Sequence, residues 1–217
     1  MINHLIVLNR ILDYPIKVDD EEEADEASPP PSLQHPPPTP PTTTTSPPTV
    51  RRSKRKSRSE LEKETILDIE ARLSATVDSL DLKEQEMYKK GRGVVTLRSF
   101  KKGEFVLEYA GELIDKVSAK DRETQYSLDT SIGSYMYYFN HKEQHYCIDA
   151  TQETARLGRL VNHSRKAPNC VPKVFTLNNT PRVILVARQD IEEDTELLFD
   201  YGDRCKESLK NHPWLML

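Results

Sequence analysis

Ten of the fifteen prolines of this 217-residue chain lie between Pro29 and Pro48, and this cluster decides where a folded domain can begin. Just before it, residues 19–26 hold seven acidic side chains. Proline lacks a backbone donor, and neither stretch has enough apolar surface to offset the entropy of ordering. We therefore predict that residues 1–58 are a disordered tail with polyproline-like stretches. One domain of about 130–160 residues should follow.

The charge distribution favours a basic partner for this domain. The net charge is −4, and residues 1–58 hold eight basic and eight acidic side chains, so the remainder carries all of it. An acidic body suits a basic protein better than bare nucleic acid. The basic block Arg51–Arg58 instead favours nuclear import or a contact with the DNA phosphate backbone, and a solvated linker is the alternative.

Cysteine usage and hydropathy argue against a secreted, metal-binding or membrane protein. Cys147, Cys170 and Cys205 are widely spaced and form no CxxC pair, so we expect free thiols and no metal site. No apolar run approaches the roughly 18 residues needed to span a bilayer. Residues 1–10 make a poor signal peptide because their one cation follows the apolar run. We expect an intracellular monomer.

Short aromatic and β-branched runs predict a mostly β domain of small sheets. Strands are expected at residues 91–97, 105–109, 112–114, 135–139, 146–149, 173–177, 183–187 and 196–199, with hairpins about residues 141–145 and 178–181. Helices are expected at residues 115–126 and 204–211. A further helix capped by Ser59 should pack through an apolar stripe of Leu61, Ile66, Ile69, Leu73, Val77 and Leu80.

Two polar segments interrupt the strands and are the candidates for a binding site. Arg156–Ser164 is neither a clean strand nor a good helix, because Asn, His and Ser side chains bond to nearby backbone. The second segment is Leu197–Asp203. Tyrosines crowd the same region: Tyr109, Tyr135, Tyr137, Tyr138, Tyr146 and Tyr201. Most would fill a small core, but a narrow aromatic tube for a lysine side chain is the alternative.

Six motifs, in their order and spacing, resemble the SET-domain protein lysine methyltransferases. They are Gly91-Arg-Gly93, Glu108-Tyr109-x-Gly111, Tyr135-Met-Tyr-Tyr138, Asp149-Ala-Thr151, Arg159-x-x-Asn162-His163-Ser164 and Glu196–Arg204. The spacing and the His212–Leu215 ending are similar to the histone H4 lysine-20 monomethyltransferase branch. The resemblance covers about residues 60–217. It implies a flanking helical segment at 59–89, a SET domain at 90–203 and a cofactor-capping tail at 204–217.

The resemblance implies a fold with a C-terminal pseudoknot, in which the chain end threads a loop near Asn162, and a set of site residues. S-adenosylmethionine would be the cofactor. It would be held by Lys90, Gly91, Arg92, Tyr135, Asn162, His163 and Trp214, with Trp214 stacked on the adenine. The catalytic residues would be Tyr201, Tyr109 and Phe199. The expected substrate is the histone H4 tail or nucleosome, and the expected location is the nucleus and the chromosome, in chromatin regulation.

One departure from that branch concerns the reaction product. Phe199 stands where the branch normally has a tyrosine, which implies room for a second methyl group. The chain also lacks the cysteine-rich zinc segment that ends typical members of the larger family, and this fits the branch. The alternatives to an enzyme are a catalytically silent SET-like module that binds histone tails and a nucleic-acid binder that uses Arg51–Arg58.

Overall fold

The computed structural model describes residues 6–8, 56–129, 132–133, 135–204, 206–211 and 213–216, without the side chains of residues 6–8, 207, 208, 211 and 214. The strands are β1 (Ile6–Leu8), β2 (Leu82–Met87), β3 (Gly91–Thr96), β4 (Phe105–Glu108), β5 (Glu112–Asp115), β6 (Met136–His141), β7 (Gln144–Asp149), β8 (Asn162–His163), β9 (Cys170–Leu177), β10 (Thr180–Ala187) and β11 (Leu198–Phe199). The helices are α1 (Arg58–Ser74), α2 (Lys116–Ser127), α3 (Lys206–Asn211) and the 3₁₀ turns η1 (Gly158–Leu160) and η2 (Pro213–Met216). Among these described elements, no helix is long and apolar enough to cross a membrane.

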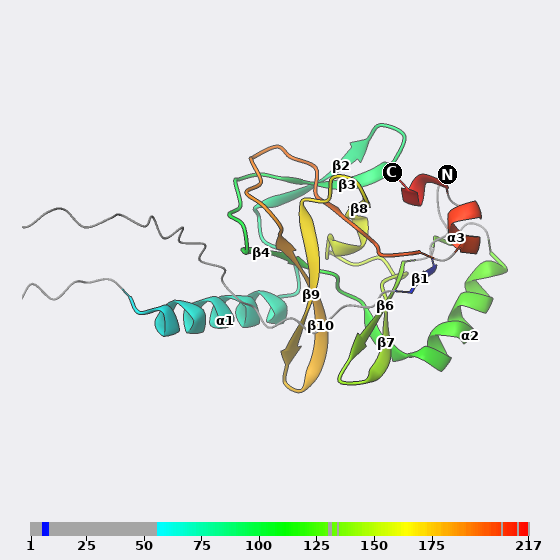
Figure 1. The fold of residues 1–217 in the computed structure, drawn as a ribbon, viewed down its shortest axis with the longest axis horizontal. Coiled ribbons are helices and arrows are strands. Elements are labelled where there is room, and N and C mark those ends of the chain that lie inside the picture. The colour runs from blue at the N-terminus through cyan, green and yellow to red at the C-terminus, as the bar shows by residue number, and fades with distance from the viewer. Residues whose placement is uncertain are drawn as a thin grey trace, which may run out of the picture.

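Three small sheets build the domain (Figure 1). Their strand orders are β1-β6-β7-β5, β4-β10-β9-β11-β8 and β2-β3. The hairpins β6–β7 and β9–β10 turn at Lys142–Glu143 and Asn178–Asn179, where all four residues have positive φ. Such turns match the right-handed twist of the flanking strands. The predicted mostly β class and both hairpins are confirmed.

The two polar segments of the sequence meet in the second sheet. Strand β11 lies between β9 and β8 and runs parallel to both, with Leu198 opposite Asn162 and Phe199 opposite His163. The Ser164 amide donates to the Phe199 carbonyl at 3.1 Å. The prediction that these segments come together is therefore confirmed. The β9–β10 hairpin lies between them in sequence and folds back to allow the contact.

Helix α1 begins two residues earlier than the predicted Ser59 cap. The Ser57 hydroxyl accepts from the Glu60 amide, and the Glu60 carboxylate accepts from the Ser57 amide, which forms a capping box. Both serines have a glutamate three residues later, and the box forms at the first of them. The prediction of Ser59 as the cap is therefore wrong.

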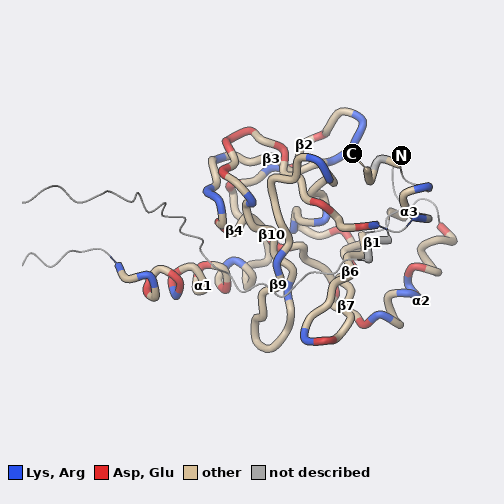
Figure 2. The backbone as a smooth tube through the Cα atoms, viewed as in Figure 1, with Lys and Arg blue, Asp and Glu red and all other residues tan. Residues whose placement is uncertain are grey.

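Only the last two turns of α1 pack on the domain. Ile69 and Leu73 contact Phe105, Phe175 and Ile184 on one face of the β4-β10-β9 sheet. The other four members of the predicted stripe are exposed, so that part of the prediction is wrong: Leu61, Ile66, Val77 and Leu80. The N-terminal part of α1 projects away from the body and carries charges of both signs (Figure 2).

Three described strands, β1, β2 and the two-residue β8, lie where the sequence predicts none. Strand β2 pairs antiparallel with β3, so the segment 59–89 is not wholly helical. Its three exposed polar residues between Lys83 and Met87 hide the strand pattern. Strand β1 pairs parallel with β6, and its three residues lie within the tail that the sequence predicts as disordered. The other residues of 1–55 lie outside the described residues, whereas Ser57 and Arg58, which the prediction placed in the tail, cap and begin α1.

Glycine 158 sets the distance between the core and the first polar segment. A Cβ atom there would lie 2.1 Å from the Glu108 carbonyl oxygen, so no side chain fits. Turn η1 can therefore lie directly against the end of β4. This close approach brings Tyr109, the next residue after β4, towards Asn162 and His163.

Candidate active site

Four aromatic rings from distant parts of the chain form one cluster. Tyr109 follows β4, Tyr137 lies on β6, Phe199 lies on β11 and Tyr201 follows it. Ring centroids are 5.3 Å apart for Tyr109 and Tyr137, 6.3 Å for Tyr109 and Phe199, and 4.7 Å for Phe199 and Tyr201. The Tyr137 and Phe199 centroids are 6.0 Å apart. These distances are typical of interacting aromatic pairs, so the four rings form one packed, π-rich cluster.

Two tyrosine hydroxyls of this cluster are held by backbone carbonyls. The Tyr201 hydroxyl donates to the Val161 carbonyl at 2.8 Å, and the Tyr109 hydroxyl donates to the Tyr135 carbonyl at 3.1 Å. Burial raises the pKa of both hydroxyls above the ordinary value near 10. Both therefore stay protonated at neutral pH. They can orient a ligand by hydrogen bonds, and they are not proton-accepting tyrosinates.

His163 connects the two polar segments to the C-terminus. Its Nδ1 atom accepts from the Tyr201 amide at 3.1 Å, and its Nε2 atom lies 3.1 Å from the Leu215 carbonyl oxygen. Because Nδ1 accepts, the proton of the neutral ring belongs on Nε2, which then donates to Leu215. Leu215 is fully buried. The C-terminal residues thus contact the His163 loop, where the resemblance implied a pseudoknot.

This neutral imidazole should make stability depend on pH. Burial lowers the pKa of His163 below its ordinary value near 6.5. The unfolded chain then binds more protons than the folded one in this range, so stability is full above about pH 6.5 and falls as pH decreases towards the lower folded-state pKa. We expect urea unfolding to show a larger loss between pH 7 and 5 for the wild type than for His163→Gln. Parallel curves for the two proteins would contradict this prediction.

A second group of polar side chains gathers on the other side of β8. The Asn162 side-chain amide donates to the Glu196 carboxylate at 3.0 Å and to the Arg92 carbonyl at 3.3 Å. The Lys90 ammonium pairs with the same Glu196 carboxylate at 2.8 Å. Lys90 of the β2–β3 turn and Arg92 of β3 therefore lie close to Asn162, Lys90 through the shared Glu196 carboxylate and Arg92 through its carbonyl.

The residues of this group fit the amino-acid end of S-adenosylmethionine. Lys90 and Arg92 keep partly exposed cations that suit a carboxylate, and Glu196 offers a carboxylate that suits an ammonium group. Gly91 has a φ of 77°, a backbone conformation that favours glycine, and it lies exposed at the start of β3. A Cβ at Gly93 would approach the Asn162 amide nitrogen to 2.8 Å. The close approach of β3 to Asn162 thus needs a glycine there.

Tyr135 and Trp214 complete the predicted cofactor set. The Arg159 guanidinium lies 3.7 Å from the centroid of the Tyr135 ring, and its Nε donates to the Ala150 carbonyl at 2.8 Å. Tyr135 is therefore held against a buried cation beside the aromatic cluster. Trp214 lies in η2 next to Leu215, and its side chain is outside the described residues.

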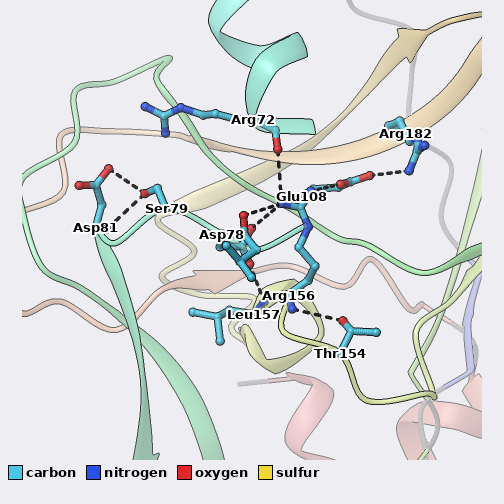
Figure 3. A network of polar contacts seen from close by, with 10 residues as sticks. Arg72, Asp78, Ser79, Asp81, Glu108, Thr154, Arg156, Leu157 and Arg182 are labelled. Carbon is cyan, nitrogen blue, oxygen red and sulfur yellow. Dashed lines mark hydrogen bonds and ion pairs between the residues drawn. The ribbon is translucent and has the colours of Figure 1, made fainter. Parts of the chain in front are cut away.

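A buried ion network includes Glu108, the residue just before Tyr109 of the cluster (Figure 3). Arg156 pairs with the Glu108 carboxylate and with Asp78 at 3.3 Å, and Arg182 reaches Glu108 at 3.2 Å. Arg156 also donates to the Val77 carbonyl at 3.2 Å. A cleft of about 430 Å³ lies beside this network. The network joins the chain after α1, the end of β4 and the start of the first polar segment.

Sequence analysis assigned no role to Asp78, Glu108 or Glu196. Glu108 ends a strand whose four residues are all buried, and a buried carboxylate requires a cationic partner. The run Phe105-Val-Leu-Glu-Tyr109, which places one carboxylate in an apolar strand, already indicated such a partner. Its partner Arg156 is 48 residues away, and spacing alone does not reveal such a pair.

The remaining chemistry-bearing residues form no further site in the described part of the chain. Cys147 and Cys170 are free and buried, and burial raises the pKa of both thiols. Among the described residues, no group of three or more His, Cys, Asp or Glu side chains could hold a metal ion.

Comparison with known proteins matches the SET domain model at residues 91–202. N-lysine methyltransferase KMT5A of Xenopus tropicalis is 52% identical over 166 residues, which are 76% of this chain and 49% of the relative. Histone-lysine N-methyltransferase Set8 of Drosophila melanogaster is 50% identical over 167 residues, which are 76% of this chain and 24% of the relative. The crystal structure of CpSET8 from Cryptosporidium shares 38% identity with a TM-score of 0.59, over 73% of this chain and 70% of that one.

The chain thus spans about half the length of the frog relative and about a quarter of the fly relative. The family model covers the strands that carry the aromatic cluster and both polar segments. This match agrees with the parallel pairing of β8 and β11 and with the site built around it. The chain belongs to the SET-domain family.

Proposed function

We propose that this chain is a lysine methyltransferase that uses S-adenosylmethionine and acts on lysine 20 of histone H4. The observation that carries the proposal is the pairing of β8 with β11, which places the Tyr109, Phe199 and Tyr201 cluster against the Asn162 and Glu196 group. The lysine would enter at the aromatic cluster, and the cofactor would bind at the other side of β8. Relatives named KMT5A and Set8 are lysine methyltransferases by name, and this supports the same chemistry here.

The residues of the cluster can prepare a lysine for methylation. S-adenosylmethionine supplies an electrophilic methyl group on a sulfonium when it is bound. The amine must then be neutral, and burial among the rings of Tyr109, Tyr137 and Phe199 lowers the pKa of an entering lysine. The neutral Tyr109 and Tyr201 hydroxyls would orient it. Because no covalent enzyme intermediate is needed, positioning accounts for most of the rate enhancement.

A methyl-transfer assay tests this proposal directly. The 217-residue chain, labelled S-adenosylmethionine and nucleosomes should give labelled histone H4, and mass spectrometry should place the label on lysine 20. An H4 peptide with arginine at that position is the matched control and should take up no label. Binding of the H4 tail without methyl transfer would support the silent histone-binding module in place of the enzyme.

Phe199 provides a prediction about the product. Its fully buried ring lies at the centre of the cluster, and a tyrosine there would place a hydroxyl group in the space that a second methyl group would use. We expect the wild type to produce dimethyl-lysine as well as monomethyl-lysine, and Phe199→Tyr to produce mainly monomethyl-lysine. The masses of a methylated H4 peptide measure this. Only monomethyl product from the wild type would refute the prediction.

The basic block Arg51–Arg58 is proposed to serve nuclear import and nucleosome binding. Residues 51–55 lie outside the described residues, and Lys56 pairs with exposed Glu64 on α1. Changing Arg51, Arg52, Lys54, Arg55 and Lys56 to glutamine leaves the Ser57 capping box in place. We expect this variant to lose nuclear accumulation and salt-dependent nucleosome affinity, while its activity on a short H4 peptide is retained. Unchanged import and affinity would contradict both roles.

A further inference from the structure

The run Leu5-Ile-Val-Leu8 is the longest unbroken apolar run of the tail, which from Asp19 to Arg58 is acidic, proline-rich or basic. Aliphatic and β-branched residues of this kind favour strands. In the structure, three residues of this run form strand β1, which pairs with β6 in parallel. Ile6 lies opposite Met136, Val7 opposite Tyr137 and Leu8 opposite Tyr138.

This pairing lies at the aromatic cluster. The strand order β1-β6-β7-β5 makes β6 the edge of its sheet when β1 is absent (Figure 1). Tyr137 of β6 contacts Tyr109 and Phe199, and the Tyr135 carbonyl just before β6 accepts from the Tyr109 hydroxyl. An edge strand offers unpaired amides and carbonyls to an extended peptide. A peptide bound along β6 would therefore run beside the residues proposed to hold the lysine.

We propose that Ile6–Leu8 binds the β6 edge in cis and competes there with the peptide that carries the substrate lysine. This inference rests on the proposed function, and it adds regulation by the chain's own tail. The tail segment provides backbone pairing at β6 but no lysine, since none of residues 1–10 is a lysine. It would therefore occupy the peptide edge without being methylated.

The length of the tail allows this contact. Residues 9–55 separate β1 from the start of the described segment at Lys56. The acidic and proline-rich sequence of these residues predicts an unstructured chain, and a coil of that length would have a root-mean-square span on the order of 40 Å, comparable with the size of a domain. Tethering at such lengths gives an effective concentration on the order of 1 mM. A weakly pairing strand is then bound for most of the time, although the same peptide added freely would bind little.

The 217-residue chain with Val7→Pro tests the inference, because proline removes the amide at the centre of β1 and disfavours strand pairing. Thr44→Pro in the proline-rich stretch is the matched control. We expect Val7→Pro to lower the KM for an H4 peptide about tenfold at unchanged kcat, since the edge becomes free. Thr44→Pro should behave as the wild type. A synthetic peptide of residues 1–12, added to Val7→Pro, should inhibit competitively against the H4 peptide.

Hydrogen exchange separates this inference from the enzyme assignment. Amides of Met136–Tyr138 should exchange faster in Val7→Pro than in Thr44→Pro, whether or not the protein transfers methyl groups. Equal exchange in the two variants would overturn the inference and leave the proposed function untouched. Faster exchange with an unchanged KM would also overturn it, because β1 would then complete the sheet without lying on the path of the substrate.

Discussion

Replacing Tyr201 by phenylalanine should lower kcat for methyl transfer about 10²–10³-fold, the range seen when one positioned hydrogen-bonding group is removed from an active site. Only the hydroxyl is lost, because the ring keeps its contacts with Phe199 at 4.7 Å and His163 at 4.9 Å. The Val161 carbonyl loses its donor, which should cost about 1 kcal/mol of stability. Methyl transfer to an H4 peptide and the urea unfolding midpoint measure the two effects separately.

Tyr146→Phe is the matched control for this substitution. Its ring stacks on Phe139 with centroids 5.7 Å apart, and its hydroxyl contacts the exposed Gln144 side chain, outside the cluster. We expect this variant to keep wild-type kcat and stability. Full activity of Tyr201→Phe, or an equal loss in Tyr146→Phe, would show that the Tyr201 hydroxyl does not orient the reacting amine.

Replacing Arg156 by alanine should remove about 3–5 kcal/mol of unfolding free energy, as expected when one partner of a buried ion network is deleted. The Glu108 and Asp78 carboxylates would stay buried without their shared cation, and Arg182 would reach only Glu108. Burial already raises the pKa of Asp78, so that carboxylate is poorly hydrated in the folded protein. Urea unfolding is the appropriate measurement, because guanidinium would screen the charges.

Lys101→Ala is the control for Arg156→Ala. Lys101 pairs with Asp190 at 2.7 Å, but both groups are exposed to solvent, and such pairs add little to stability. We expect its unfolding curve to overlay that of the wild type. If the unfolding curve of Arg156→Ala also overlaid that of the wild type, the ion network in Figure 3 would not contribute to the stability of the fold.

Local signals in the sequence predicted most elements of the domain. The β6–β7 and β9–β10 hairpins, α2 and β4 follow from aromatic and β-branched runs bounded by turn residues. Strand β2 was missed because its Lys-Glu-Gln-Glu run is polar and partly exposed, and it is a strand only because β3 pairs with it. The apolar stripe of α1 predicted more packing than the structure shows, because only Ile69 and Leu73 of this stripe contact the sheet.

For the candidate site, the residues were predicted from the sequence, but their contacts and protonation states were not. The resemblance to the SET-domain methyltransferases, which rests on the order and spacing of six motifs, implied that Tyr109, Asn162, His163 and Tyr201 belong to one site. The ring contacts, the neutral state of His163 and its link to Leu215 depend on burial and on partners distant in sequence. No short stretch of sequence indicates these contacts or this protonation state.

By itself, the sequence determined which part of the chain can form a folded domain, that this domain is mostly β, and which two polar segments were candidates for a site. Secondary-structure propensity and hydrophobic pattern depend on a few neighbouring residues, so they can be read from short stretches of the sequence. Only the tertiary structure decided that β11 inserts between β9 and β8, that Arg156 neutralises Glu108, and that Ile6–Leu8 cover the β6 edge. These contacts join residues far apart in the chain, and they exist only when the β9–β10 hairpin and the turns around it bring their partners together.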